Sequence, residues 1–295
     1  MLGSLPRWIR VLCWSGVGLV VIAIALFSVS VWTVHRSFPK TSGTLTLKGL
    51  DAKVTVLRDS HGIPQIYADT SNDLFFAQGY VQAQDRFFQM DFRRHVTAGT
   101  LSSLFGTDAL ETDEVVRTMG WRRVAEQELS LISPETRRYL EAFSNGVNAY
   151  LTDHDGATLS LEYAVLGLDG VQYTPDPWTP VDSLAWLKAM AWNLGSNIDD
   201  EVDRSLESVS LTRRQIGELY PAYPYATNRP IVNQGAIVDG VFEQDARRSG
   251  TRLPQRPGFL SRSTEALLRT KHATHALSAL LGSTGGAIGS NAWAV

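Results

Sequence analysis

A long uncharged stretch near the start of the chain limits most strongly what the chain can fold into. From Val11 to Val34 the only ionisable side chain is the thiol of Cys13. A helix of this length crosses the hydrocarbon core of a bilayer, which is about 30 Å thick. We therefore predict a signal-anchor or transmembrane segment within residues 1–41.

The residues on either side of this segment help to decide between a retained membrane anchor and a cleaved signal peptide. Arg7 and Arg10 precede it, while His35, Arg36 and Lys40 follow it, so positive charge is distributed almost evenly. No Ala-x-Ala pattern ends the apolar run, and the apolar cores of signal peptides are usually shorter. We predict a retained membrane anchor with the rest of the chain outside the cytoplasm. A cleaved signal peptide followed by secretion is the alternative.

Composition excludes several classes of protein. The chain has 295 residues, of which 44% are hydrophobic and 19% are charged, which suits one sizeable buried core. A formal net charge of −3 provides no positive field for a polyanion, so we predict no nucleic-acid partner and favour a small organic substrate. Because Cys13 is the only cysteine, neither a disulfide framework nor a Cys/His zinc site can form.

Periodicity of the apolar residues predicts a short antiparallel opening followed by helices. Alternation predicts strands at 44–47, 54–57 and 63–67. A long helix is predicted from a cap at Ser71 to Gly99, with one face formed by Leu74, Ala77, Val81, Gln84, Phe88 and Asp91. Further helix starts are predicted at Ser133, Thr179 and Thr212, and another helix over 264–281, after a connector that begins near Ala222. The predicted fold class is α+β, mostly helical.

The end of the chain combines flexible residues with a candidate nucleophile. Gly282 to Gly289 is rich in glycine, and Ser290 begins a short alternation that ends at Val295. A strand that begins with no partner after it leads us to expect a longer natural chain. The glycine-rich run lacks the Gly-Lys-Ser/Thr ending of a phosphate-binding loop, so a phosphate-binding protein is only an alternative.

Several segments together resemble the penicillin acylase family. Residues 58–68, Arg-Asp-Ser-His-Gly-Ile-Pro-Gln-Ile-Tyr-Ala, are similar to its opening signature, and residues 77–86 continue the likeness into the first long helix. The ending Gly289-Ser290-Asn291, with Trp293, resembles the junction at which members of this family cleave themselves. The likeness covers most of residues 42–206 and the last six residues.

The resemblance implies a fold and a division of the chain. The fold is the four-layer αββα sandwich of an N-terminal nucleophile hydrolase, formed together with a β chain. Residues 42–232 would be the α-chain region, residues 233–289 an excised spacer, and residues 290–295 the start of the β chain. This polypeptide alone is expected to be inactive.

Ser290 is the predicted nucleophile. A serine hydroxyl needs a base, and a free α-amino group, with a pKa of about 7.7 to 8.0, is largely neutral near physiological pH. Cleavage between Gly289 and Ser290 creates that base on the nucleophile itself. Before cleavage, the same hydroxyl can attack the Gly289 carbonyl, because glycine allows the strained approach. The predicted reaction is hydrolysis of linear amides through an acyl-enzyme, with penicillin-type and other N-acyl compounds both open as substrates.

The resemblance also implies further site residues. Trp192, Asn193 and Leu194 are candidates for lining the acyl pocket. One calcium ligand is expected near the acidic stretch 197–203, with Glu201 as the candidate, and the remaining ligands would come from the β chain. A solvated acidic turn is the alternative for this stretch.

The expected partners follow from this interpretation. They are the protein's own β chain in an αβ heterodimer, a small amide substrate and, through the N-terminal helix, the membrane. Structural Ca²⁺ is the one cofactor considered, and no organic cofactor is expected. The alternative for the whole chain is a non-catalytic, membrane-anchored interaction protein or a degenerate relative.

Overall fold

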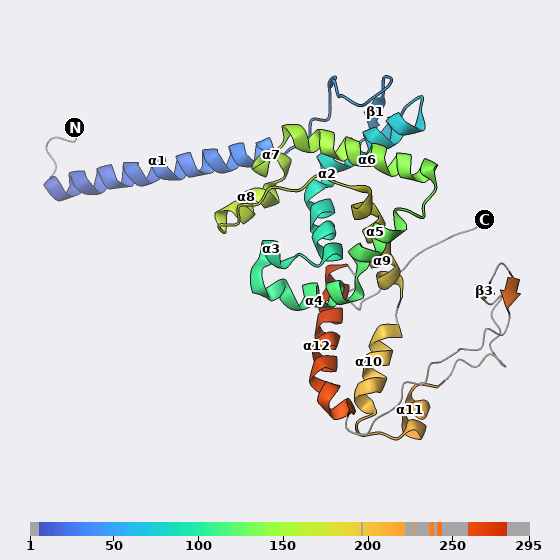
Figure 1. The fold of residues 1–295 in the computed structure, drawn as a ribbon. Coiled ribbons are helices and arrows are strands. Elements are labelled where there is room, and N and C mark those ends of the chain that lie inside the picture. Colours follow the sequence, from blue (N-terminus) through green and yellow to red (C-terminus); the bar gives the residue numbers. More distant parts are fainter. Residues whose placement is uncertain are drawn as a thin grey trace. The chain divides into compact units, whose positions relative to one another are not determined.

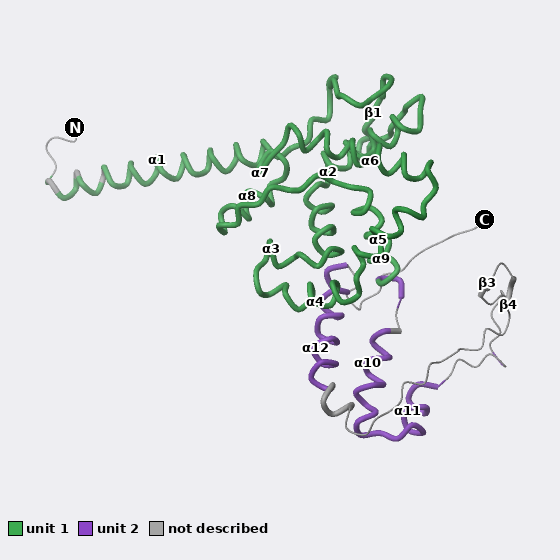
Figure 2. Tube along the Cα trace, viewed as in Figure 1, with its two compact units in different colours: residues 1–192 green, residues 193–295 purple. Residues whose placement is uncertain are grey.

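The structure is a computed structural model that describes residues 6–195, 197–221, 227, 236–238, 241–243 and 259–281. The chain divides into two compact units, Met1–Trp192 and Asn193–Val295 (Figure 2). The described part is mostly helical, as predicted, with two short β-hairpins. The boundaries expected at residues 232 and 289 stay predictions.

Unit 1 consists of a projecting helix, a β-hairpin and a set of packed helices (Figure 1). In chain order its elements are α1 (Arg7–Arg36), β1 (Thr55–Arg58), β2 (Pro64–Tyr67), α2 (Ser71–Ala98), α3 (Ser102–Phe105), the 3-10 turn η2 (Gly106–Ala109), α4 (Leu110–Met119), α5 (Trp121–Glu128), α6 (Pro134–Asp153), α7 (Gly156–Leu159), α8 (Leu161–Leu168) and α9 (Pro180–Leu194). The last two residues of α9 belong to unit 2.

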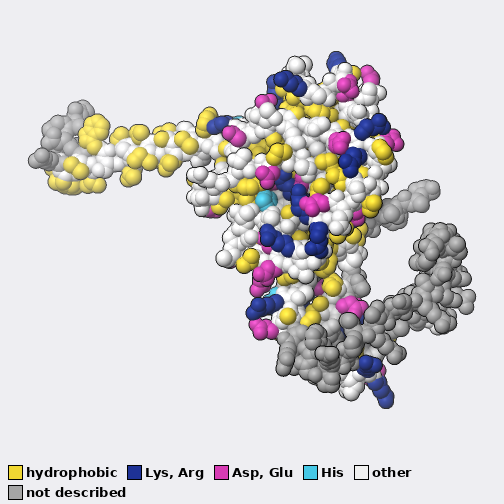
Figure 3. Space-filling model, in the orientation of Figure 1, with side chains coloured by type: hydrophobic (Ala, Val, Ile, Leu, Met, Phe, Trp, Pro, Cys, Tyr) yellow, Lys and Arg dark blue, Asp and Glu magenta, His cyan; other side chains and the backbone are white. Residues whose placement is uncertain are grey.

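The helix α1 is the one predicted from the uncharged stretch. Among the described residues, Trp14–Arg36 form one helix that is long and apolar enough to cross a membrane, and its most apolar stretch is not buried within the protein. Figure 3 shows hydrophobic side chains along the visible face of this helix where it projects from the unit. By length and composition, a membrane anchor and a signal sequence both fit α1.

The predicted opening strands are confirmed in two of three places. The strand β1 pairs antiparallel with β2, with Thr55 opposite Tyr67 and Arg58 opposite Pro64. The third prediction is wrong, because residues 44–47 are described and form no strand. Gly43 and Gly49 bracket this segment with φ values of 104° and 105°, which turn the chain on both sides of it.

The long helix α2 is nearly as predicted, with its start shifted by one residue. The cap is Thr70 rather than Ser71, since the Thr70 hydroxyl accepts a hydrogen bond from Asp73 N at 3.1 Å. Gly99 ends the helix in the left-handed conformation with φ of 65°. Most of the predicted face is buried, but Leu74 is exposed.

Two glycines let α2 and α6 pack at backbone contact. A Cβ atom at Gly79 would overlap the Phe143 carbonyl oxygen, and one at Gly146 would overlap the Phe76 carbonyl oxygen. The core of unit 1 forms around this crossing, and its buried members are Tyr80, Ala83, Phe87, Met90, Leu104, Val147, Tyr150, Leu159, Tyr163, Leu166 and Trp178. The point where α2 crosses α6 therefore sets the distance between these two helices in the core.

The capping patterns correctly predicted three further helix starts. Ser133 caps α6 by accepting from Thr136 N at 3.1 Å, and α9 begins at Pro180 directly after Thr179. In unit 2, Thr212 and Gln215 form the reciprocal capping box of α11 (Arg213–Leu219). Each start depends on hydrogen bonds between residues three positions apart, which is why the sequence alone was sufficient.

Unit 2 contains α10 (Asn197–Glu207), α11, β3 (Ala236–Val238), β4 (Val241–Glu243) and α12 (Phe259–Leu280). The acidic stretch 197–203 is part of helix α10 rather than a turn. α10 packs against α12, where Lys271 Nζ lies 2.6 Å from Asp203 Oδ1. The helix predicted over 264–281 is confirmed, with an earlier start at Phe259.

We predict that alanine at either crossing glycine destabilises unit 1. Gly79→Ala or Gly146→Ala forces α2 away from α6, at a cost of about 3 kcal/mol, the upper end for overpacking. Thermal unfolding of the detergent-solubilised protein, followed by circular dichroism, should show a clearly lower melting temperature. The control is Gly167→Ala in α8, where an added Cβ meets nothing within 4 Å. Equal melting temperatures for all three variants would contradict the role of the crossing.

Candidate functional site

The predicted nucleophile cannot be placed in this structure. Ser290 and Gly289 both lie outside the described residues, as does the rest of the C-terminal segment after Leu281. Their roles as nucleophile and processing site stay predictions.

The three residues predicted to line an acyl pocket lie at the end of α9. Trp192 is half-buried, and its ring centroid lies 5.9 Å from that of Trp121 in α5. Asn193 is half-buried, while Leu194 is 74% exposed. Their role in an acyl pocket stays a prediction.

Glu201, the candidate calcium ligand, is exposed on α10. Its Oε1 accepts a hydrogen bond from the Arg204 guanidinium at 3.3 Å. Across the described part of the chain, no three His, Cys, Asp or Glu side chains converge as they would around a metal ion. Calcium takes six to eight oxygen ligands, so the described residues do not by themselves form a calcium site. The role of Glu201 stays a prediction.

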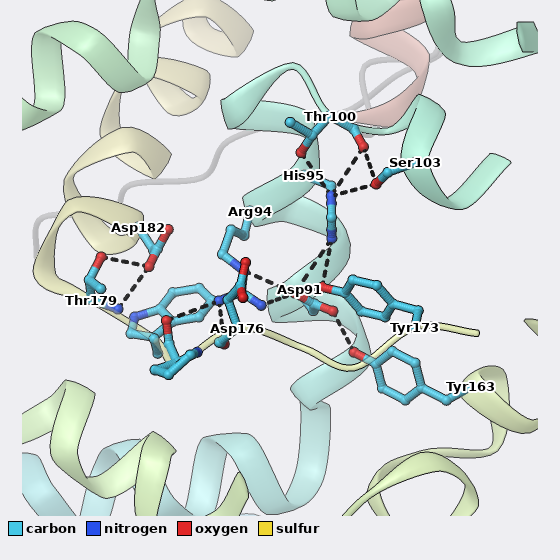
Figure 4. Close-up of polar contacts among 12 residues, drawn as sticks. Asp91, Arg94, His95, Thr100, Ser103, Tyr163, Tyr173, Asp176, Thr179 and Asp182 are labelled. Atoms are coloured by element: carbon cyan, nitrogen blue, oxygen red, sulfur yellow. Dashed lines mark hydrogen bonds and ion pairs between the residues drawn. The ribbon is translucent and has the colours of Figure 1, made fainter. Parts of the chain in front are cut away.

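The most developed polar site in unit 1 is a buried cluster around Asp91, shown in Figure 4. This Asp91 cluster comprises Asp91, Arg94, His95, Tyr163 and Tyr173. The Asp91 side chain is 1% exposed and accepts hydrogen bonds from Tyr163 Oη at 2.7 Å and from Tyr173 Oη at 3.2 Å. Arg94, on the next turn of α2, donates to Asp91 Oδ1 and forms an ion pair with it. A buried carboxylate is stable only with such partners.

Arg94 extends the cluster to the segment between α8 and α9. Its Nη1 donates to the Asp176 carbonyl at 2.8 Å, and its guanidinium lies 5.6 Å from the centre of the Trp178 ring. Burial alone would lower the pKa of Arg94, but the nearby Asp91 and Asp182 carboxylates outweigh it and raise that pKa. The guanidinium is therefore a permanent cation that joins α2 to this segment.

The two tyrosines stay protonated at ordinary pH. Burial raises the pKa of Tyr163, and the negative charge of Asp91 raises it further. The same two causes raise the pKa of Tyr173. Both phenols therefore keep the protons that Asp91 requires.

His95 lies at the other end of the cluster. Its Nε2 lies 2.8 Å from Tyr173 Oη, and its Nδ1 lies 2.8 Å from Thr100 Oγ1. One tautomer is compatible with Tyr173 donating to Asp91: Nε2–H donates to Tyr173 Oη. In this tautomer Nδ1, which also lies 3.2 Å from the Thr100 carbonyl oxygen, accepts from the Thr100 hydroxyl. Burial lowers the pKa of His95, so the neutral ring is favoured.

The Asp91 cluster holds the unit together, and Ser103 beside it does not form a nucleophile–base pair with His95. Ser103 Oγ lies 3.5 Å from His95 Nδ1 but donates its proton to the Thr100 carbonyl at 2.7 Å. The Ser103 hydroxyl is therefore not activated by His95. The cluster instead fixes α2, α8 and the 169–179 segment to one another.

A second polar contact fixes the opening signature to α2. Arg58 on β1 donates to both carboxylate oxygens of Asp85, each at 2.8 Å, and to Gln84 Oε1 at 3.0 Å. In the turn that follows, Asp59 Oδ1 accepts from the backbone nitrogens of His61 and Ile63 at 2.8 and 2.9 Å. The signature residues therefore position the hairpin, and His61 is a turn residue.

The comparison with known families agrees with this arrangement. The sequence profile of the family described as Penicillin amidase matches residues 53–295, which is more than half of the chain. The chain therefore belongs to the penicillin amidase family, and the predicted resemblance is confirmed.

Individual relatives cover different shares of the chain. It is 38% identical over 163 residues to the penicillin acylase 2 proenzyme of Pseudomonas sp. (strain SE83), which is 55% of this chain and 20% of that protein. It is 34% identical over 188 residues to the acyl-homoserine lactone acylase QuiP of Pseudomonas aeruginosa, 64% of this chain and 22% of that protein. With the penicillin G acylase of Escherichia coli it shares 31% identity over 156 residues, 52% of this chain and 18% of that protein.

The chain thus spans about a fifth of the length of the curated relatives it matches. Among solved structures, a thermostable penicillin G acylase from Alcaligenes faecalis in tetragonal form is 27% identical, with a TM-score of 0.49. That match covers 62% of this chain and 98% of the solved chain.

Sequence reasoning missed most of the Asp91 cluster. Asp91 was placed on the buried face of α2, and a carboxylate on such a face signals a buried partner. The partners Tyr163 and Tyr173 lie 72 and 82 residues further along the chain. Their separation in sequence leaves no local pattern that could have identified them.

We predict that His95 makes the stability of the protein depend on pH. Its pKa in the folded state lies below the ordinary value of 6.5, so the unfolded chain binds the proton more readily. Stability is complete above pH 6.5 and falls as the pH drops from there through the folded pKa, by at most about 1.4 kcal/mol per pH unit. Urea unfolding at several pH values between 5 and 7.5 measures this slope.

His95→Gln should remove most of this slope. His61→Gln, at an exposed turn residue, should leave it unchanged. An identical slope in the wild-type protein and in His95→Gln would show that other groups carry the pH dependence.

Proposed function

We propose that the protein is an amidohydrolase that cleaves its own backbone between Gly289 and Ser290 and then uses Ser290 as its nucleophile. The observation that carries this proposal is the family match, which extends to residue 295 and so runs across this junction. The name of one relative, a penicillin acylase proenzyme, supports a precursor that needs processing.

The proposed self-cleavage uses groups of this chain and one water molecule. Ser290 Oγ attacks the Gly289 carbonyl carbon, the C–N bond between the two residues breaks, and the nitrogen takes up the hydroxyl proton. The resulting ester between Gly289 and Ser290 is hydrolysed by water, which leaves a carboxylate on Gly289 and a free amine on Ser290. Glycine favours this attack because it allows backbone conformations that are strained for other residues.

The proposed catalytic cycle repeats this chemistry on the substrate. The amine of Ser290 accepts the proton of Oγ as the oxygen attacks the amide carbonyl of the substrate, and the leaving amine takes that proton. An acyl-enzyme ester remains, and water activated by the same amine releases the acid. The amine suits this task because its pKa of about 7.7 to 8.0 lies close to the working pH.

In this proposal the described residues within 42–232 build the α-chain side of the enzyme. Residues 42–232 would form the α chain, residues 233–289 the spacer, and residues from 290 onward the β chain, together giving the αββα sandwich. Trp192, Asn193 and Leu194 would line part of the acyl pocket, which the exposed end of α9 leaves accessible. Glu201 would supply one calcium ligand, with the others from the β chain.

The substrate class is an N-acyl amide. The relatives include penicillin acylases and acyl-homoserine lactone acylases, and all of these names denote removal of an acyl group from nitrogen. A small neutral or weakly charged substrate also suits a chain with a formal net charge of −3.

The proposed location is the outer side of a membrane, with α1 as a retained anchor. Support comes from the length of Trp14–Arg36, about 35 Å as a helix, which exceeds the hydrocarbon thickness of about 30 Å. The absence of an Ala-x-Ala pattern after the apolar run favours retention over removal as a signal peptide.

We predict that Ser290→Ala abolishes both processing and activity in the full-length protein. The wild-type protein should separate into two chains, the larger one beginning at Ser290, and should hydrolyse chromogenic N-acyl amides. Ser290→Ala should remain one chain, with activity reduced by at least about 10⁴-fold, since both nucleophile and base are lost. Intact mass spectrometry and an amide hydrolysis assay measure the two effects.

The matched control is Ser283→Ala, which changes the other Gly-Ser pair of the same glycine-rich run. This variant should process and react as the wild type does. Processing of Ser290→Ala, or amide hydrolysis by it, would disprove the proposed function.

A further inference from the structure

The helix α8 exposes an apolar stripe that no described element covers. Leu161, Val165 and Leu168 lie on one face at helical spacing, with 37%, 52% and 88% of their surfaces exposed. The opposite face carries Tyr163 and Leu166, which are buried in the core of unit 1. Since Tyr163 is held by Asp91, the helix cannot rotate to bury the stripe.

This stripe lies beside the base of the projecting helix. Both α7 and α8 contact α1, and Figure 1 shows them where α1 leaves the unit. Thr33 and Val34 are half-buried, whereas Val31 and Trp32 just before them are exposed, so α1 meets the unit near Thr33. Thr33 lies inside the apolar span that ends at Arg36.

Helix geometry gives the level along α1 at which the unit meets it. Arg36 lies three positions after Thr33, a rise of about 4.5 Å. The end of the span carries Trp32 and Phe38, which are 59% and 60% exposed, and the Arg36 guanidinium lies 4.4 Å from the centre of the Trp32 ring. Exposed aromatic residues beside a basic one are typical of the boundary between lipid headgroups and acyl chains. The part of unit 1 that contacts α1, to which α7 and α8 belong, therefore lies near that boundary.

We propose that α8 lies in the membrane surface as a second membrane contact, with Val165 and Leu168 inserted between lipid headgroups. This inference rests on the proposed retention of α1 as an anchor. Once α1 spans the bilayer, it holds α8 against the lipid surface, so the insertion requires little additional ordering. The apolar stripe is then in contact with lipid, which is also apolar.

The neighbouring surface supports lipid as the occupant. A hollow of about 540 Å³ beside α8 is lined mainly by apolar side chains, among them Phe88, Phe105, Val165 and Val171. Glu162 and Asp169 are also exposed on or next to this helix, so electrostatic attraction to anionic lipid does not drive the contact. Neutral phosphatidylcholine should therefore be sufficient.

Photocrosslinking in the full-length protein tests this inference. A benzophenone amino acid replaces Leu168, which is 88% exposed, so the change leaves the core intact. The control places it at Leu131, which is 80% exposed in the connection between α5 and α6, at the end of unit 1 away from α1 (Figure 1). Both proteins are reconstituted in phosphatidylcholine vesicles and illuminated, and adducts are identified by mass spectrometry.

The expected result is a phospholipid adduct at position 168 at least tenfold more abundant than at position 131. A crosslink from position 168 to another part of the protein would overturn the proposal, because the stripe would then be a protein interface. Equally low lipid adducts at both positions would also overturn it. Resistance of the protein to alkaline extraction, measured on the same vesicles, reports separately on whether α1 is a membrane anchor.

Discussion

The rest of unit 1 depends on the ion pair and hydrogen bonds that the buried Asp91 carboxylate forms. An unpaired charge at this depth would be very unfavourable, so Arg94, Tyr163 and Tyr173 must all be in place for the core to close. Through these partners α2 holds both α8 and the segment that leads into α9. The orientation of α8, and with it the exposure of its apolar stripe, follows from the same contact.

Local chemistry explains which parts of the fold the sequence could predict. The starts of α6, α9 and α11 each follow from a cap within a few residues, and the length of α1 follows from its lack of charge. The short helices α3 to α5, α7 and α8 were not predicted. Gly120, with φ of 72°, separates α4 from α5, and tertiary contacts, with α2 in the case of α4, α5 and α7, stabilise helices that are too short to be stable alone.

The candidate site residues also differ in this respect, because some follow from local sequence and others come together only in the folded protein. Ser290 could be proposed because Gly289-Ser290-Asn291 and Trp293 resemble the processing junction of the family and the upstream segment 58–68 resembles its opening signature; the Gly-Ser pair alone is equally typical of a linker. The Asp91 cluster could not be assembled, since its members come from α2, α8 and a later segment. Trp192 was singled out from its position in the family pattern, while its pairing with Trp121 is a tertiary contact that the sequence does not show.

Covalent labelling of the processed full-length protein tests the central claim most directly. A sulfonyl fluoride reacts with an activated serine hydroxyl, and the labelled residue can be identified by peptide mass spectrometry. The account predicts a single stoichiometric label on the peptide that begins Ser290-Asn291-Ala292, with loss of amide hydrolysis as the label accumulates. Complete loss of activity with the label on any other residue would contradict it.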